Sequence, residues 1–514
     1  MSSPRRSSRA PVVGRTLELG SLRSVLGDAL DLLEQGVGEC LVYCGWNQAS
    51  STSRDSREHR ISNQSAPKTE WRRKLRYEGL EERALLAVVT WDGGGADNKW
   101  STAANWVGDV APLANDDIVL PAAASQKTIL YDESLVAYDD ITVDGQGYTI
   151  QGPNPLLFRN FYVNQNDLTV STNLGNGSQN YAMGIYVGSG GSNALSNIVF
   201  EGQVAMGNTS AAGLGISVVN GSQATFSAPI TGNGRIVVSS SDANGPSSQV
   251  VFSGANTFRD TLTVSNSILV VRNVEALGIA ETNPGLRDAG TILENARLIL
   301  ENNVTIASEP LQFGSNSIPN SHGTLATVAN QVVAWNGPIS SPATGGYSLR
   351  FVSGENATLS INGSFNVNTG ISVIGWSNVV FNCTNGTATK LYASQTNLQI
   401  DGTLNLTELV EVTNANIGGT GQLLNSGGGF YYNGTTIAPG APSQIGTLTL
   451  GNVEQYAGDR IVIQVNGTGQ GQFDQLRVIG TASLQSNLDL ILGSSIGLNQ
   501  SVVIVDNDSN DAIL

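Results

Sequence analysis

Side chains able to carry out acid–base or nucleophilic chemistry are scarce in this sequence. A nucleophilic triad needs a histidine or a substitute base beside the nucleophile, and beyond residue 90 there is one histidine, His322, within IPNSHGTLA. That setting is typical of a loop, so we expect His322 to be a solvated loop residue. The signatures of zinc peptidases, P-loops and dinucleotide-binding turns do not occur, which disfavours those enzyme classes. No catalytic residue is assigned from the sequence.

Asp506, Asp508 and Asn510 have a spacing that is typical of metal ligands. Residues two apart on a strand share a face, and oxygen ligands of this kind bind Ca²⁺. The segment DNDSND resembles the first half of a calcium loop, but Asp511 stands where that loop needs glycine, and no glutamate completes it. We name the three residues as a candidate calcium site, with a polar terminal turn as the alternative. No other cofactor is indicated.

Adjacent carboxylates occur at Asp116-Asp117 and Asp139-Asp140. A polysaccharide lyase or hydrolase needs carboxylates that converge on one substrate. Neighbouring side chains on a strand point to opposite faces, so we expect each pair to be divided between two faces.

Three tryptophans, Trp91, Trp100 and Trp106, stand among turn formers in TWDGGGADNKWSTAANWVGD. Exposed beside Asp and Asn, they could stack on sugar rings. The open end of a repeat fold, however, leaves apolar surface and unpaired strand edges in water unless something covers it. We therefore expect these residues to form a cap, with glycan stacking as the alternative.

The elements that must position these residues are predicted to be short strands. The chain has 514 residues, of which 13% are charged and 60 are glycine, a composition typical of stacked β-repeats with a narrow apolar interior. From about residue 138, short runs rich in Val, Ile, Leu and Thr alternate with turn formers, including nine Asn-Gly dipeptides. Asn and Gly accept the positive φ that sharp corners require.

Two further features favour parallel stacking over hairpins. The residues that alternate with the apolar positions are Thr, Ser, Asn and Gln, which suits side chains stacked in register, because like charges would repel from coil to coil. No helical period of ten or more residues follows residue 90 to supply the crossovers of an α/β sheet. We predict an all-β chain that folds as a right-handed parallel β-helix, a β-solenoid, with a mostly disordered N-terminal leader.

The charge distribution limits the partners. From Trp91 onward there are 12 Lys/Arg and 31 Asp/Glu, a net charge of −19, which disfavours binding to nucleic acid or to anionic lipid. No transmembrane span is predicted. The three cysteines, Cys40, Cys44 and Cys383, are too few for a disulfide framework, and no second pair or histidine cluster completes a metal site with Cys40 and Cys44.

The predicted organisation has five parts: a disordered leader, a segment that looks like a secretion signal, an N-terminal cap with entry coils, the β-helix repeats, and the C-terminal coils. Their bounds are 1–70, 71–89, 90–137, 138–440 and 441–514.

The second of these parts contains Leu80-Glu81-Glu82-Arg83-Ala84-Leu85-Leu86, preceded by basic residues. It resembles the LEPR-x-LL leader of many secreted proteins of planctomycete bacteria, with Glu82 in place of the usual proline. The resemblance implies secretion or display at the cell surface. Because the leader in that family lies near the initiating methionine, residues 1 to about 65 are hypothesised to reflect an upstream start.

The stretch VFSGANTFRDTLTVSNSILVVRNVEALG, residues 251–278, resembles the autotransporter-associated β-strand repeat. Asp260 and Ser267 replace two of the usual glycines of its pattern. The pattern is matched by Gly254, Asn256, Thr257, Phe258, Thr263 or its neighbour, Leu269 and Ala276-Leu277-Gly278. The segment from GTTIAPGAPSQIGTLTLGN onward resembles the shared end of such proteins. That end usually continues further, so we expect the chain to be cut short at residue 514.

Two functions remain open on the sequence. The leading hypothesis is a non-enzymatic secreted or surface β-solenoid with a structural or adhesive role, whose partners would be extracellular polysaccharide or cell-surface components. The alternative is a carbohydrate-active β-helix, a lyase, a glycoside hydrolase or a glycan-binding module. Three or more carboxylates converging in one groove would favour the enzyme.

Overall fold

The computed structural model describes residues 87–513 except 166, 177–181, 189–196, 208–211, 243–246, 280–289, 315–321, 343–347, 428, 441–443, 494–495 and 509–512. Residues 1–82 and 83–514 form two units, and every described residue belongs to the second. The predicted leader, most of the signal-like segment, Cys40 and Cys44 therefore lie outside the described residues.

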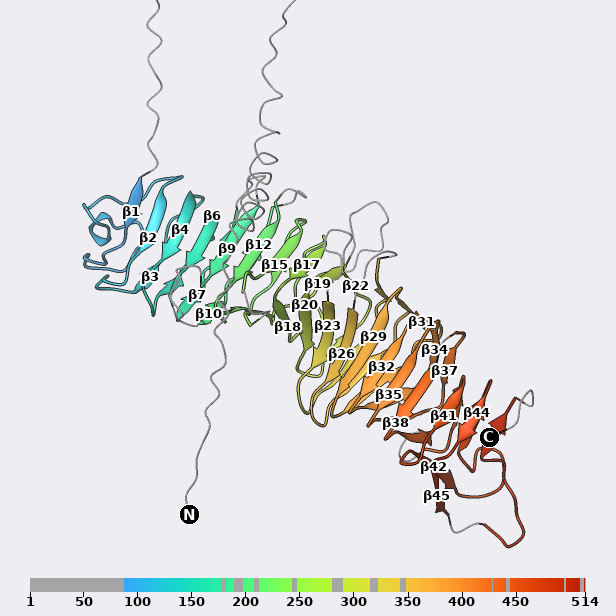
Figure 1. Cartoon of the computed structure of the whole chain (residues 1–514). Helices are drawn as coiled ribbons and strands as arrows, with labels where there is room; N and C mark the ends of the chain where they lie inside the picture. Colours follow the sequence, from blue (N-terminus) through green and yellow to red (C-terminus); the bar gives the residue numbers. More distant parts are fainter. Residues whose placement is uncertain are drawn as a thin grey trace, which may run out of the picture. The chain divides into compact units, whose positions relative to one another are not determined.

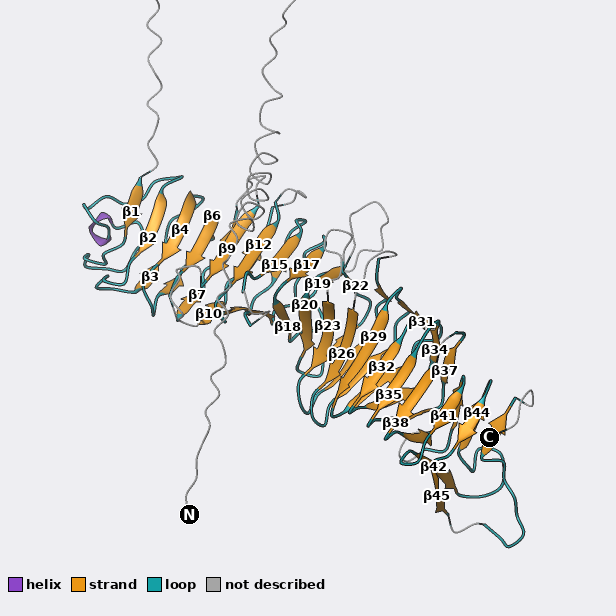
Figure 2. Ribbon diagram, in the orientation of Figure 1, coloured by secondary structure: helices purple, strands orange, loops and turns teal. Residues whose placement is uncertain are grey.

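The second unit is a parallel β-helix, as the sequence predicts (Figures 1 and 2). Three long sheets run along it, and each coil contributes a strand to each sheet it passes through. We call them the first, second and third sheets.

The first sheet has 21 strands. They are β1 Val88–Thr90, β2 Asp117–Leu120, β4 Ala137–Val143, β6 Leu156–Val163, β8 Leu174–Gly175, β9 Met183–Val187, β11 Val204–Ala205, β12 Leu214–Val218, β14 Ile230–Thr231, β15 Ile236–Ser239, β17 Leu262–Ser265, β19 Thr291–Glu294, β22 Leu311–Phe313, β25 Ile339–Ser340, β28 Phe365–Asn366, β31 Gly386–Ala388, β34 Thr403–Leu406, β37 Gln422–Asn425, β40 Thr447–Leu450, β43 Gln475–Val478 and β46 Val505–Asn507.

The second sheet has 14 strands. They are β3 Thr128–Leu130, β5 Thr149–Gln151, β7 Leu168–Val170, β10 Asn197–Phe200, β13 Gln223–Phe226, β16 Gln249–Phe252, β18 Ile268–Val271, β20 Ala296–Leu300, β23 His322–Thr327, β26 Ser348–Ser353, β29 Gly370–Gly375, β32 Leu391–Ser394, β35 Val410–Thr413 and β38 Phe430–Asn433. A separate two-stranded sheet is formed by β41 Val453–Gln455 and β44 Ala482–Leu484, and β41 lies against β38, the last strand of the second sheet.

The third sheet has nine strands and begins later in the chain. They are β21 Thr305–Ile306, β24 Val332–Trp335, β27 Thr358–Ile361, β30 Asn378–Phe381, β33 Asn397–Ile400, β36 Asn416–Gly419, β39 Thr436–Pro439, β42 Arg460–Val465 and β45 Asn487–Leu492. One 3-10 turn, η1 Ala103–Asn105, lies in the segment between β1 and β2.

The interior is a stack of apolar side chains in register. Strands pair in parallel from β1 with β2 to β43 with β46, so equivalent inward positions of successive coils meet. Phe200, Phe226 and Phe252 illustrate this, with ring centroids 4.8 and 5.7 Å apart along the stack. The alternation of apolar and small polar residues in the sequence therefore produces one continuous core.

The corners use asparagine and glycine in two different ways. Positive φ is common at Asn, for example at Asn220 and Asn266, as expected. The glycines of the dipeptides at Gly337 and Gly363 instead have ordinary φ values. A Cβ at Gly363 would lie 1.9 Å from the carbonyl oxygen of Gly337, so these glycines are required because consecutive coils approach closely, not because of their conformational freedom.

The hydroxyl of Tyr432 is a local weakness in the core. Its side chain is fully buried, the hydroxyl has no hydrogen-bond partner in the described part of the chain, and burial raises the pKa of the phenol. Because a buried hydroxyl without a partner costs free energy, we expect Tyr432→Phe to raise the free energy of unfolding by about 1 kcal/mol, measured by urea denaturation.

Tyr138→Phe is the matched control for Tyr432→Phe. The hydroxyl of Tyr138 accepts a hydrogen bond from Trp100 Nε1 at 2.8 Å, so its removal is expected to destabilise the protein. Equal effects of the two substitutions would contradict the argument.

Candidate functional site

The three N-terminal tryptophans lie in the core. Trp91, Trp100 and Trp106 are each 0% exposed, and Trp106 packs edge to face against both others at centroid distances of 5.1 and 4.9 Å. Each indole N–H donates a hydrogen bond, to Gln126 O, Tyr138 Oη and Trp100 O respectively. Because all three rings are buried, they cannot stack on a sugar in this structure, and the glycan-stacking alternative is wrong. The cap remains a prediction.

The calcium prediction remains a prediction. Asp506 lies in β46, where it pairs in register with Arg477 of β43, and Arg477 Nε is 3.9 Å from Asp506 Oδ2. Asp508 is described, but Asn510 lies outside the described residues.

The histidine and cysteine of the β-helix offer little reactivity. His322 is exposed, as expected, but it is the first residue of β23 and not part of a loop. Cys383 is buried, and burial raises the pKa of its thiol, which disfavours the reactive thiolate.

Three carboxylates converge on the outer surface of the first sheet. Asp117, Asp139 and Asp140 have oxygen atoms that all lie within 4.8 Å of one another. We call these residues, with Arg159 and Asn160, the bend cluster. The expectation that Asp139 and Asp140 face opposite sides is wrong.

A bend in β4 explains this difference. Tyr138 and Ile141 are both buried, and the two aspartates between them are half-buried. In the next coil β6 repeats the pattern, and its two halves then pair with separate strands, β8 and β9. The rule that successive side chains of a strand point to opposite faces therefore does not hold at this bend of the first sheet.

Basic and amide side chains hold the bend cluster together. Arg159 Nε is 2.8 Å from Asp139 Oδ1, and Nη2 is 3.8 Å from Asp140 Oδ1. Asn160 Nδ2 donates to Asp140 Oδ1 at 2.8 Å. Burial raises the pKa of Asp139 although Arg159 opposes the shift. The cluster is thus a partly neutralised network in which one carboxyl binds its proton more tightly than usual.

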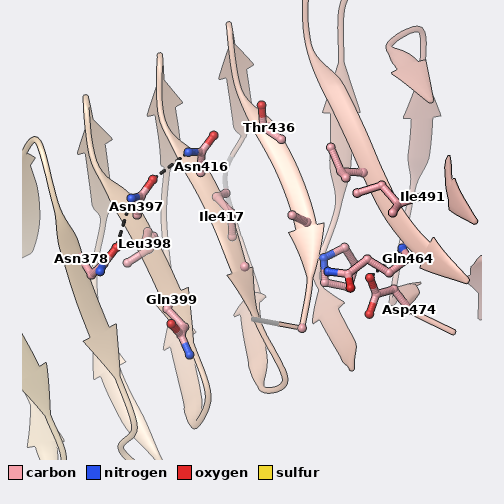
Figure 3. A pocket seen from close by; sticks show the side chains of 15 residues that line it. Asn378, Asn397, Leu398, Gln399, Asn416, Ile417, Thr436, Gln464, Asp474 and Ile491 are labelled. Atoms are coloured by element: carbon pink, nitrogen blue, oxygen red, sulfur yellow. Dashed lines mark hydrogen bonds between the residues drawn. The ribbon is translucent and has the colours of Figure 1, made fainter. Parts of the chain in front are cut away.

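A groove lies on the outer face of the third sheet (Figure 3). Its volume is about 360 Å³. We call it the third-sheet groove, and it is lined by Asn378, Asn397, Leu398, Gln399, Asn416, Ile417, Gly418, Thr436, Ala438, Pro439, Gly440, Val462, Gln464, Asp474 and Ile491.

The groove exists because two neighbouring strands diverge. β39 and β42 pair at only two positions, beginning with Thr436 opposite Arg460, whereas β42 pairs with β45 along its whole length. Beyond β39 the chain bonds back toward β36, where the peptides of Gly419 and Gly440 exchange hydrogen bonds of 2.6 and 2.8 Å. The sheet therefore opens between β39 and β42.

Asp474 closes the base of this opening. Its side chain is almost fully buried, with Oδ1 accepting from Gly446 N at 2.9 Å and Oδ2 from Gln464 N at 2.8 Å. Burial raises the pKa of Asp474, and these two hydrogen bonds oppose that shift. Its carboxylate thus satisfies peptide groups that a paired strand would otherwise satisfy.

A row of amides forms one wall of the groove. Asn378, Asn397 and Asn416 occupy equivalent outward positions of three successive coils. Asn397 Nδ2 donates to Asn378 Oδ1 at 3.0 Å, and Asn416 Nδ2 donates to Asn397 Oδ1 at 2.7 Å (Figure 3). An amide has two N–H donors and two acceptor lone pairs, so this asparagine ladder keeps hydrogen-bonding capacity for a ligand.

An exposed tryptophan stands beside the ladder. Trp376 is 76% exposed, and a shallow pocket of about 280 Å³ next to it shares Asn397 and Asn416 with the groove. Ile374 pairs with Ser394, and Asn378 with Asn397. The corner that carries Trp376 is therefore one residue longer than the equivalent corner of the next coil, which gives the indole room outside the sheet.

No site was predicted in this region from the sequence, although the sequence contains two signals of it. They are a tryptophan in a Gly-Trp-Ser corner, and asparagines at 378, 397 and 416, spaced by one coil. The divergence of β39 and β42 has no comparable signal.

Comparisons with known proteins do not extend this description. No protein-family model matches the chain, and no curated protein or solved structure does so either. Among the described residues there is no helix with the length and apolar character needed to cross a membrane.

Proposed function

We propose that this protein is a non-enzymatic β-solenoid of the cell exterior with a structural and adhesive role. The observation that carries the proposal is the surface formed by the asparagine ladder, Trp376 and the third-sheet groove. Among the described residues that line it, Asp474 alone has a titratable side chain, and both of its oxygens are engaged by peptide N–H groups. Such a surface can bind, but it lacks a free acid or base.

Location outside the cell is supported by the leader resemblance and by the surface chemistry. The net charge of −19 beyond residue 90 keeps a protein soluble and disfavours nucleic acid. Outward rows of Asn, Ser and Thr present hydrogen-bonding groups without charge, which suits contact with hydrated polymers.

Co-sedimentation of the full chain with insoluble polysaccharides and bacterial cell walls tests the proposal. We expect binding without release of reducing sugars or of unsaturated products. Sustained sugar release would refute the non-enzymatic role, and absence of binding to every material would refute the adhesive one.

The bend cluster favours a second candidate, a carbohydrate-active enzyme, because three carboxylates converge there and burial raises the pKa of Asp139. If the protein releases sugar, Asp139→Asn should abolish the release. Glu411→Gln, on β35 of the second sheet, is the control and should leave it unchanged.

A further inference from the structure

We infer that Trp376, the asparagine ladder and the third-sheet groove form one binding site for an uncharged glycan chain that lies across successive coils. This inference rests on the proposed adhesive function and names the ligand class. It is carried by the indole, the amides and the groove, which are contiguous because the two cavities share Asn397 and Asn416.

Trp376 provides the apolar contact that a sugar ring needs. Four of the five tryptophans among the described residues are buried at 0% exposure, and Trp376 is the exception. The exposed indole leaves a large apolar surface in contact with water, and a bound partner would cover that surface. Pyranose rings have one face of C–H groups, which packs on an indole, and a rim of hydroxyls, which needs amide donors and acceptors.

The ladder provides that polar contact in a repeating form. Neighbouring strands lie about 4.8 Å apart, so Asn378, Asn397 and Asn416 present amides at regular steps across the coils. Beyond them the groove has small residues at Gly418 and Ala438, and an apolar side at Val462. A chain with alternating polar edges and apolar faces fits this surface better than a compact ligand does.

The charge of the site favours uncharged glycans over anionic ones. The described lining contains neither lysine nor arginine. The position next to Asn416 in the following coil is Thr436, and the one after it is Arg460. Arg460 already forms an ion pair with Asp489. Because the protein is strongly acidic and the described lining of the groove carries no cation, uronate or sulfated chains would be repelled.

Isothermal titration of the full chain with cellohexaose, xylohexaose and mannohexaose, and with hexagalacturonate as the anionic probe, tests the inference. At least one neutral hexasaccharide is expected to bind, and hexagalacturonate is expected to bind at least tenfold more weakly. Failure of all three neutral probes, or preference for the uronate, would overturn the inference. The proposed adhesive function is judged separately by co-sedimentation.

Variants locate the site. Trp376→Ala is expected to weaken the neutral ligand by about tenfold, the loss of about 1.4 kcal/mol, and Asn416→Ala by a smaller factor. Tyr431→Ala removes another exposed aromatic, from β38 outside the lining, and should leave affinity unchanged. Equal losses in the two aromatic variants would place the ligand elsewhere.

A filled groove gives a second, independent test. Ala438→Phe puts a ring into the groove, whereas Ser360→Phe puts the same ring on β27 of the same sheet, outside the lining. Only Ala438→Phe should abolish binding, with unchanged circular dichroism in both variants. Retained affinity in Ala438→Phe would exclude the groove from the site.

Discussion

Trp100→Ala is expected to lower the free energy of unfolding of the N-terminal coils by about 4 kcal/mol, the usual cost of removing a buried tryptophan. Trp100 lies at the centre of the cap. Its ring packs against Trp106, Tyr131 and Tyr138 at centroid distances of 4.9, 5.4 and 5.5 Å. Truncation would leave a cavity among three rings and would remove the donor to the Tyr138 hydroxyl.

The loss of stability caused by Trp100→Ala should affect the N-terminal coils before it affects the rest of the β-helix. In a stacked repeat each coil contacts only its neighbours, so loss of the cap exposes the first coils first. Hydrogen exchange should show lost amide protection in β2, β4 and β6, with protection in β30 and β33 retained. Urea denaturation with tryptophan fluorescence measures the size of the loss.

Trp376→Ala is the matched control, because it removes the same side chain from an exposed corner. Its effect on stability should stay within about 0.5 kcal/mol. A small effect of Trp100→Ala, or uniform loss of protection along the whole β-helix, would contradict the capping role.

In β45, the last strand of the third sheet, the inward-facing side chains have no further described coil packed over them. Ile461 and Ile463 of β42 are buried, whereas Leu488 and Leu490, which pair with them in β45, are each 48% exposed. We expect the buried tryptophans to prevent such exposure at the N-terminal end. That role would account for the large aromatic residues there in an otherwise aromatic-poor chain.

The sequence predicts the coil architecture because the relevant signal is local. Alternation of apolar and small polar residues decides which side of a strand faces the core. Burial follows that alternation in strands such as β2, β12 and β27, but not at the bend in β4. Corner chemistry is partly predictable. At the corner that precedes Ser267, the positive φ is supplied by Asn266, with φ 49°.

The sites are less predictable because they depend on how coils differ from one another. The adjacency of Asp139 and Asp140 on one surface comes from a bend that forms where one strand is replaced by two in later coils. The third-sheet groove comes from the early end of pairing between β39 and β42. Neither event changes the local composition, so neither can be found from residue types and spacing.

Asn256 shows how one buried side chain can join successive coils. The side chain is buried, with Oδ1 accepting from Ile230 N at 2.8 Å and Nδ2 donating to Ala276 O at 2.5 Å. It therefore joins β14 to the corner that follows β18. Gly254, two residues earlier, must lack a side chain because a Cβ there would lie 2.4 Å from Ala228 O.

Asn256→Ala is accordingly expected to lower the free energy of unfolding by about 3 kcal/mol, because it leaves a buried N–H and a buried C=O unpaired at about 1–3 kcal/mol each. Asn256→Asp should be at least as damaging, since a carboxylate oxygen would face the carbonyl oxygen of Ala276. Asn378→Ala, an exposed asparagine on a strand, is the control and should change stability by less than about 0.5 kcal/mol. Urea denaturation measures the stability of the three variants. Similar midpoints for Asn256→Ala and Asn378→Ala would mean that Asn256 does not hold the coils together.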